Sequence, residues 1–124
     1  MRHKEEPMDI IVRGGEKITS YKALRSLPKS EEFWIDRGKR PRIERIERVY
    51  FYKNSEVVGY CMFSRYGPYD DTNVQGERQR GHAIWVRGPF IELPQAVCFS
   101  LPGPWRWRYL DRVPHLLRIL REPS

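Results

Sequence analysis

Aromatic and arginine residues alternate near the end of the chain, in the segment 105–109 (WRWRY). Successive side chains of a β-strand point to opposite faces, so a strand here would group the three rings on one face and the two arginines on the other. Rings that face a ligand stack on nucleobases, and arginines bind phosphate. The same alternation also suits a hydrophobic core with a solvated outer face. Trp105 follows the segment 102–104 (PGP), so we expect it at the rim of the domain, within reach of a ligand.

A second group of cations lies in the segment 37–42 (RGKRPR), where glycine and proline favour a surface loop. We predict that Arg40 in this loop contacts phosphate, and that Arg87, next to a Gly-Pro pair, does the same. Trp34 is a further candidate for stacking on a base. Acidic residues near the loop leave open the alternative of a salt-bridged surface.

Lys17 and Ser20 follow a pair of glycines and are separated by two residues. In a turn this spacing places an amine beside a hydroxyl, and a desolvated lysine can activate a hydroxyl as a nucleophile. The alternative is a surface lysine that binds phosphate, with Ser20 offering a polar contact. Cys61 and Cys98 have no Cys or His partner at metal-ligand spacing, so we expect both to be buried residues of strands and expect neither a metal nor a cofactor.

The elements that must position these residues are clearest at 49–63 (VYFYKNSEVVGYCMF), which predicts two antiparallel strands joined by a short polar turn. Gly59 lies inside the second strand, where a glycine indicates a bend or a close approach to the backbone. Short helices are predicted at 19–27 and 30–35, each with a Ser or Thr cap. The polar segment 67–81 predicts a long mobile loop.

The remaining segments predict short strands, among them 82–87, and 113–120 fits either a closing strand or a helical turn. We therefore expect a mainly β protein, a small barrel decorated by two short helices. Residues 1–7 are expected to be a loosely ordered lead-in, and residues 8–124 a single domain.

An opening strand at 8–13, a Gly-x-Lys turn that ends at Lys17, a helical stretch and the hairpin pattern together resemble the PUA-like β-barrel superfamily, and within it ASCH-type domains. The resemblance implies recognition of RNA or a modified base in an open cleft at the rim of the barrel. Some ASCH-type domains are amidohydrolases of N4-acylated cytidine that use a Lys, a Thr and a Glu. On that alternative Lys17 and Ser20 are the reacting pair, Ser20 replaces the Thr, and no Glu is assigned.

The composition is that of a folded, basic protein: 40% of the 124 residues are hydrophobic, and the net charge is +7. Arginine supplies 17 of the 23 basic residues, which suits a phosphate-bearing partner but also the composition of a thermophile. No uncharged apolar run approaches the roughly 18 residues that span a membrane. The first residues lack the apolar stretch of a signal peptide, so we expect a cytoplasmic protein with no membrane partner.

These observations favour a binding module for RNA or a nucleotide-like ligand. The predicted site residues are Lys17, Ser20, Trp34, Arg40, Arg87 and Trp105. An amide hydrolase that uses Lys17 and Ser20 is the first alternative. The second is a small module that binds another protein through exposed aromatic residues.

Overall fold

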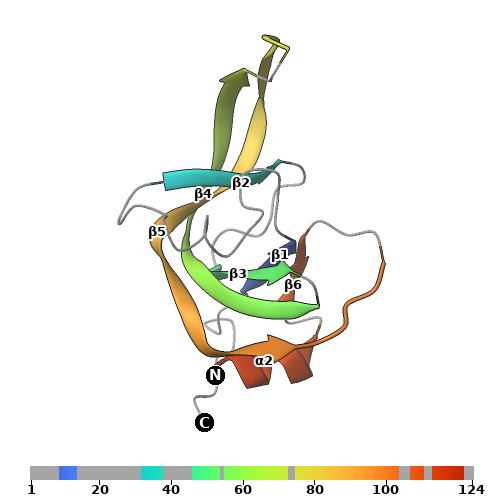
Figure 1. Ribbon diagram of the computed structural model, residues 1–124. Coiled ribbons are helices and arrows are strands. Elements are labelled where there is room, and N and C mark those ends of the chain that lie inside the picture. Colours follow the sequence, from blue (N-terminus) through green and yellow to red (C-terminus); the bar gives the residue numbers. More distant parts are fainter. Residues whose placement is uncertain are drawn as a thin grey trace, which may run out of the picture.

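In the described part of the chain, the fold is a curved β-sheet with one helix packed against it (Figure 1). The computed structural model describes residues 9–13, 32–37, 46–53, 55–72, 75–103, 107–110 and 113–121. Its elements are β1 (Ile10–Arg13), β2 (Glu32–Arg37), β3 (Arg48–Lys53), β4 (Glu56–Thr72), β5 (Arg78–Cys98), β6 (Trp107–Tyr109) and α2 (Pro114–Arg121). The prediction of a mainly β protein with short helical structure is confirmed.

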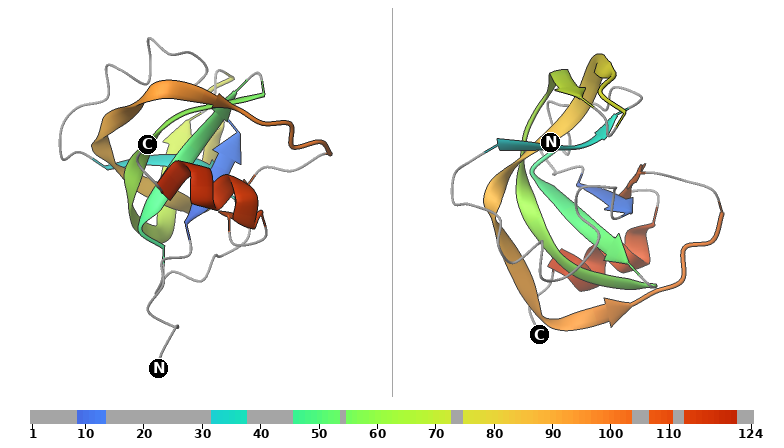
Figure 2. Two further views of the ribbon diagram at one scale, coloured as in Figure 1. Left: turned by 90° about the horizontal axis from the view of Figure 1, so that it is seen from below. Right: turned by 45° about the horizontal axis from the view of Figure 1, so that its top comes forward.

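The strands form one mixed sheet in the order β2-β5-β4-β3-β1-β6. Only β1 and β3 are parallel among the described pairs, and the other pairs are antiparallel. Strands β4 and β5 are long and strongly curved, and their lower part bends around the side on which α2 lies (Figure 2). The sheet is open, with β2 and β6 at its edges, and the predicted closure into a barrel is not seen among the described residues.

Strands β1 and β3 are buried on both faces, which explains their continuous apolar sequences. Alternate residues enter two different hydrophobic clusters: Ile10 and Phe51 pack in the first, beneath the curve of β4 and β5. Ile11 and Tyr50 pack in the second, against α2. The centre of the sheet is therefore held by two cores, one on each face.

Helix α2 begins at Pro114, where the missing backbone N–H of proline costs no helical hydrogen bond. Leu116 and Leu120 lie one turn apart and are both buried in the second cluster. Arg118 and Arg121 occupy the last turn, where positive charge is favourable to the helix dipole. The C-terminal segment is thus a helix, one of the two possibilities that its sequence allowed.

The predicted hairpin is confirmed as β3 and β4, with Ser55 in the turn at a φ of 61°. A close approach is also confirmed at Gly59. A Cβ at this position would overlap the carbonyl oxygen of Ile91 and the ring of Phe90 on β5. The absence of a side chain on β4 therefore lets β5 pack directly onto it.

The prediction of a helix at 30–35 is wrong, because Glu32–Arg37 is strand β2, which pairs with β5. A Ser followed by acids resembles a helix start, but Phe, Trp and Ile in succession favour a strand when an edge is available to pair with. The other predicted helix, 19–27, and the lead-in 1–7 lie outside the described residues.

The prediction of a long loop at 67–81 is also wrong. Strand β4 continues to Thr72 and β5 begins at Arg78, so the segment forms the end of a long two-stranded ribbon. Charges of opposite sign meet across it: Arg78, diagonal to Asp70 in the register, donates to its carboxylate at 2.5 Å. Cross-strand pairs of this kind stabilise antiparallel strands of polar composition.

The two cysteines differ from the sequence prediction in one respect. Cys61 is buried as expected, and burial raises the pKa of its thiol to about 12. Cys98, at the end of β5, is exposed rather than buried, because the strand leaves the core before it ends. Both are free thiols.

Candidate nucleic-acid interface

The structure describes two of the predicted site residues in whole or in part. Arg87 lies on β5 with its side chain exposed, and the backbone of Trp34 lies in β2. The roles predicted for the others stay predictions, because those residues lie outside the described parts of the chain: Lys17, Ser20, Arg40 and Trp105.

Arg87 and Trp34 are brought to one region of the sheet by the pairing of β2 with β5. In this register Glu32 lies opposite Arg87, and Trp34 lies opposite Trp85. Residues opposite each other on antiparallel strands are near neighbours. Two of the positions predicted to bind nucleic acid are thus separated by only two ladder steps.

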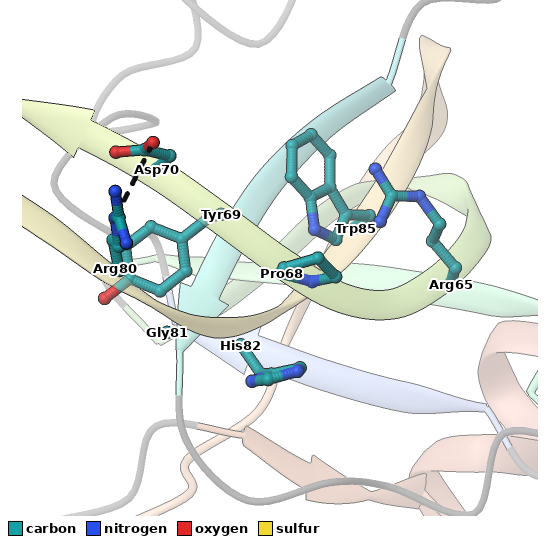
Figure 3. A pocket seen from close by; sticks show the side chains of 8 residues that line it. All are labelled: Arg65, Pro68, Tyr69, Asp70, Arg80, Gly81, His82 and Trp85. Carbon is teal, nitrogen blue, oxygen red and sulfur yellow. Dashed lines mark ion pairs between the residues drawn. The ribbon is translucent and has the colours of Figure 1, made fainter.

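Trp85 is the centre of this region, and Arg65 of β4 covers it. The guanidinium carbon of Arg65 lies 4.3 Å from the centroid of the Trp85 ring, a cation–π contact. The indole Nε1 of Trp85 donates a hydrogen bond of 3.2 Å to the carbonyl oxygen of Gly67. Figure 3 shows the indole and the guanidinium lying together on the ribbon. The ring is held at one edge while remaining half-buried.

Glu32 of β2 fixes the arginine from the other side. Arg65 Nε lies 3.2 Å from Glu32 Oε1, and the hydroxyl of Ser64 donates a short hydrogen bond to the same carboxylate. The Ser64 hydrogen bond, followed by the hydrogen bond and charge of Arg65, holds the pKa of Glu32 below its ordinary value of 4.5. Arg87 adds a smaller electrostatic contribution in the same direction. Glu32 therefore stays ionised and orients Arg65 over the indole.

A shallow pocket of about 630 Å³ extends from Trp85 along the ribbon (Figure 3). Arg65 and Trp85 line one end of it, and Asp70 and Arg80 line the other, with His82 between them. Asp70 pairs with Arg78 and lies 3.9 Å from Arg80, so one carboxylate is shared by two arginines. The hydrogen bond from Arg78 holds the pKa of Asp70 below its usual value. The ribbon thus presents exposed cations beside aromatic and imidazole rings.

A further ring pair belongs to the same ribbon, where Tyr66 and His82 stack with their centroids 5.8 Å apart. Tyr66 packs against the first hydrophobic cluster, whereas His82 is exposed. The His82 ring is consequently held by packing at a position that solvent can reach.

Of the aromatic segment 105–109, the structure describes residues 107–109. Trp107 and Tyr109 of β6 pack against the first hydrophobic cluster, with their rings in an edge-to-face arrangement 5.0 Å apart. Both are half-buried, so for these two rings the core interpretation holds. Arg108 lies on the opposite face and donates to the carbonyl oxygen of Pro102 at 3.4 Å.

Sequence reasoning did not select Arg65, Trp85 or Glu32. A signal for Trp85 was present: strict alternation in 82–87 (HAIWVR) places Trp85 and Arg87 on one face and Ile84 and Val86 on the other. Nothing local identifies Arg65 or Glu32, because the contact of Arg65 with Trp85 and its ion pair with Glu32 depend on how three strands pair.

No group of three His, Cys, Asp or Glu residues in the described parts of the chain is placed to hold a metal ion. In the same parts, no helix has the length and apolar character needed to cross a bilayer. Comparison with protein-family models, with curated proteins and with solved structures found no match to this chain.

Proposed function

We propose that the protein binds single-stranded RNA, or another ligand with a nucleobase and a phosphate, on the surface formed by β2, β4 and β5. One observation carries the proposal: a half-buried indole, Trp85, is covered by the guanidinium of Arg65 and has the exposed Arg87 beside it. Aromatic rings and arginine planes are the two surfaces on which proteins stack bases, and arginines bind phosphate.

The arrangement favours stacking over a purely structural role for Arg65. A surface ion pair contributes little to stability, so the contact with Glu32 is only a weak structural reason for the position of Arg65. Here Glu32 holds the guanidinium over the ring, and the Arg65 side chain is 42% exposed, so a base can reach the guanidinium. Arg87 lies two residues from Trp85 on the same face of β5 and can bind a flanking phosphate.

Two substitutions of Trp85 separate stacking from simple apolar contact. Trp85→Phe keeps a π-face, and we expect the affinity for fluorescently labelled oligouridine to stay within about threefold of the wild type. Trp85→Leu keeps apolar volume without the ring on which Arg65 is held, and it should weaken binding by about tenfold or more, since the base stacks on that guanidinium and a base stack contributes roughly 1–3 kcal/mol. Fluorescence anisotropy measures both.

Thermal melting of the two variants checks that each remains folded. Equal affinities of the folded variants Trp85→Leu and Trp85→Phe would contradict the proposal of a stacking site at Trp85. Absence of any oligouridine binding by the wild type, together with capture of a protein partner, would favour the interaction-module alternative.

A further inference from the structure

A second and larger cleft, of about 760 Å³, lies between β5 and α2. Ile91, Leu93 and Val97 line it from β5, and Ile119 and Leu120 line it from α2. It is separate from the ribbon pocket, whose lining residues on β5 end at Trp85. A cleft of this volume is in the range that holds small-molecule ligands.

The wall that β5 contributes to the cleft includes an irregularity in the pairing of β5 with β4. Glu92 pairs with Gly59 and Val97 with Val57, so a single residue of β4 faces four residues of β5, 93–96. A bulge bends the strand that carries the extra residues. The four residues 93–96 all line the cleft beside α2.

Exposed apolar side chains converge on this space. Three large hydrophobic residues are exposed in the described parts of the chain, and two of them, Ile91 at 40% and Ile119 at 41%, line the cleft from opposite sides. Single exposed hydrophobic residues are common, but two that face one cavity form a surface suited to an apolar group.

The cleft also contains a cation, Arg48. Its guanidinium lies 4.5 Å from the centroid of the Tyr60 ring, and Nη1 donates a hydrogen bond of 3.0 Å to the Tyr50 hydroxyl. Within the described residues no ion pair joins Arg48 to a carboxylate, Glu92 on the cleft wall included. Arg48 is therefore oriented by two tyrosines and not neutralised by them.

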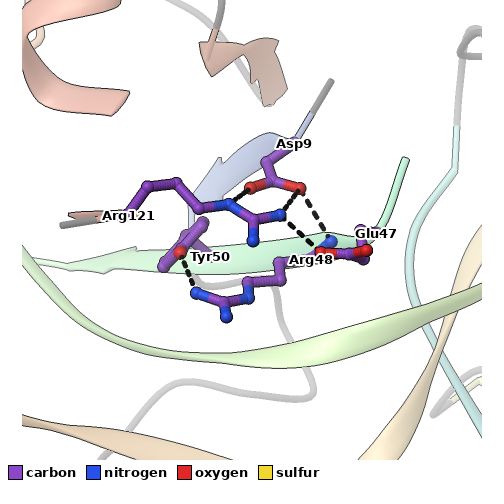
Figure 4. A network of polar contacts seen from close by, with 5 residues as sticks. All are labelled: Asp9, Glu47, Arg48, Tyr50 and Arg121. Atoms are coloured by element: carbon purple, nitrogen blue, oxygen red, sulfur yellow. Dashed lines mark hydrogen bonds and ion pairs between the residues drawn. The ribbon is translucent and has the colours of Figure 1, made fainter. Parts of the chain in front are cut away.

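Arg121, the other arginine of the cleft, is already neutralised (Figure 4). It lies 2.8 Å from Asp9, which is fully buried, and 2.7 Å from Glu47. Figure 4 shows the side chain of Arg121 directed at these two carboxylates, whereas that of Arg48 reaches toward Tyr50. A bound anion would thus find its partner in Arg48.

We propose that this cleft binds a small amphiphile: an anionic head group, carboxylate or phosphate, on Arg48 and an apolar tail between Ile91 and Ile119. An arginine fork pairs with either head group through charge-assisted hydrogen bonds, and the tail covers apolar surface that is otherwise in water. The site is independent of RNA binding on the ribbon.

Titration of the isotope-labelled full chain with octanoate, octyl phosphate and octanol, followed by amide NMR shifts, tests the proposal. We expect at least one of the two anions to bind about tenfold or more tightly than octanol, because a hydrogen bond to a charged group is lost with octanol. The shifts should lie in β5 and α2. The anion that binds more tightly shows whether the head group is a carboxylate or a phosphate.

Arg48→Gln should reduce the affinity for the anion to that for octanol, while the matched change Arg118→Gln, on the exposed side of α2, should have no effect. Since Arg48 is partly buried, Ile119→Glu provides a second variant at an exposed position, and its negative charge should abolish anion binding. Equal binding of octanol and both anions, anion binding that survives these substitutions, or shifts confined to the β4–β5 ribbon would overturn the proposal.

Discussion

At the scale of single residues, the most constrained position is Gly59. It pairs with Phe51 on one side and Glu92 on the other, and the backbone of β5 occupies the place that a side chain would need. The two cores lie next to this contact. A substitution here therefore displaces β5 and with it the wall of the cleft.

Gly59→Val should lower the free energy of unfolding by about 1–3 kcal/mol, the usual cost of forcing extra atoms into a packed interior, despite the better strand propensity of valine. Chemical denaturation measures it. Gly67→Ala is the control, because its Cβ would meet only the side chain of Arg65, and displacing that partly exposed ion pair costs little stability. A Gly59→Val variant as stable as the wild type would contradict the close approach of β5 to β4 at Gly59.

Glu32 makes the stability of the β2 edge depend on pH. Its pKa is lowered in the folded protein, first by the Ser64 hydrogen bond and then by Arg65. A lowered pKa stabilises the fold above the ordinary value of 4.5, and this contribution is lost as the pH falls through the folded-state pKa. Glu32→Gln should therefore melt below the wild type at neutral pH, and the difference should shrink as the pH falls below 4.5. A difference that is constant with pH would contradict the ionised state of Glu32.

At the scale of elements, a polar network attaches α2 to the sheet. The two oxygens of the buried Asp9 accept hydrogen bonds of 2.8 and 3.1 Å from Arg121, and the Arg48 backbone N–H donates a further one of 2.9 Å. The last turn of the helix is thus joined to the start of β1 and β3. Leu116 and Leu120 supply the apolar part of the same contact.

Arg121→Leu should destabilise the protein by about 3 kcal/mol, because it leaves the Asp9 carboxylate buried without its partner. Arg118→Leu removes the same charge from the same turn of α2 at an exposed position and should change stability by less than about 0.5 kcal/mol. Thermal and urea unfolding compare the two. Equal stabilities of the two variants would mean that burial of the Asp9 carboxylate does not depend on its ion pair with Arg121.

At the scale of the whole molecule, the two proposed sites lie at different levels of the β4–β5 ladder, one on the ribbon and one beside α2 (Figure 1). The net charge of +7 favours any anionic partner without selecting a site. The position of the RNA site therefore has to be tested by substituting arginines one at a time. The salt dependence of the affinity of each variant provides the measurement.

If Arg87 contacts a phosphate of bound RNA, Arg87→Gln should reduce the slope of log affinity against log salt by about 0.7. Arg118→Gln, remote from the ribbon on α2, should leave the slope unchanged. The same change at Lys17 and at Arg40 tests the phosphate contacts predicted for those residues. Affinity that does not vary with salt in the wild type would exclude phosphate contacts altogether.

The features that follow from the sequence alone are local ones. The β3–β4 hairpin was predictable because strand alternation and a polar turn act over neighbouring residues. The close approach at Gly59 was predictable because a glycine weakens a strand unless a bend or a neighbouring backbone requires it. The buried state of Cys61 followed from the same strand pattern. Strand β2 was not predictable, because its capping signals pointed to a helix and only pairing with β5 decided otherwise.

Tertiary structure alone decided where the candidate sites lie. Arg65 meets Trp85 because β4 and β5 pair in a register that shifts between Phe63 and Arg65, which no local pattern specifies. Asp9 and Arg121 are separated by 112 residues and meet only when α2 closes over the sheet. Side-chain chemistry can be read from a sequence, but these juxtapositions depend on long-range register and packing, which local residue preferences do not determine.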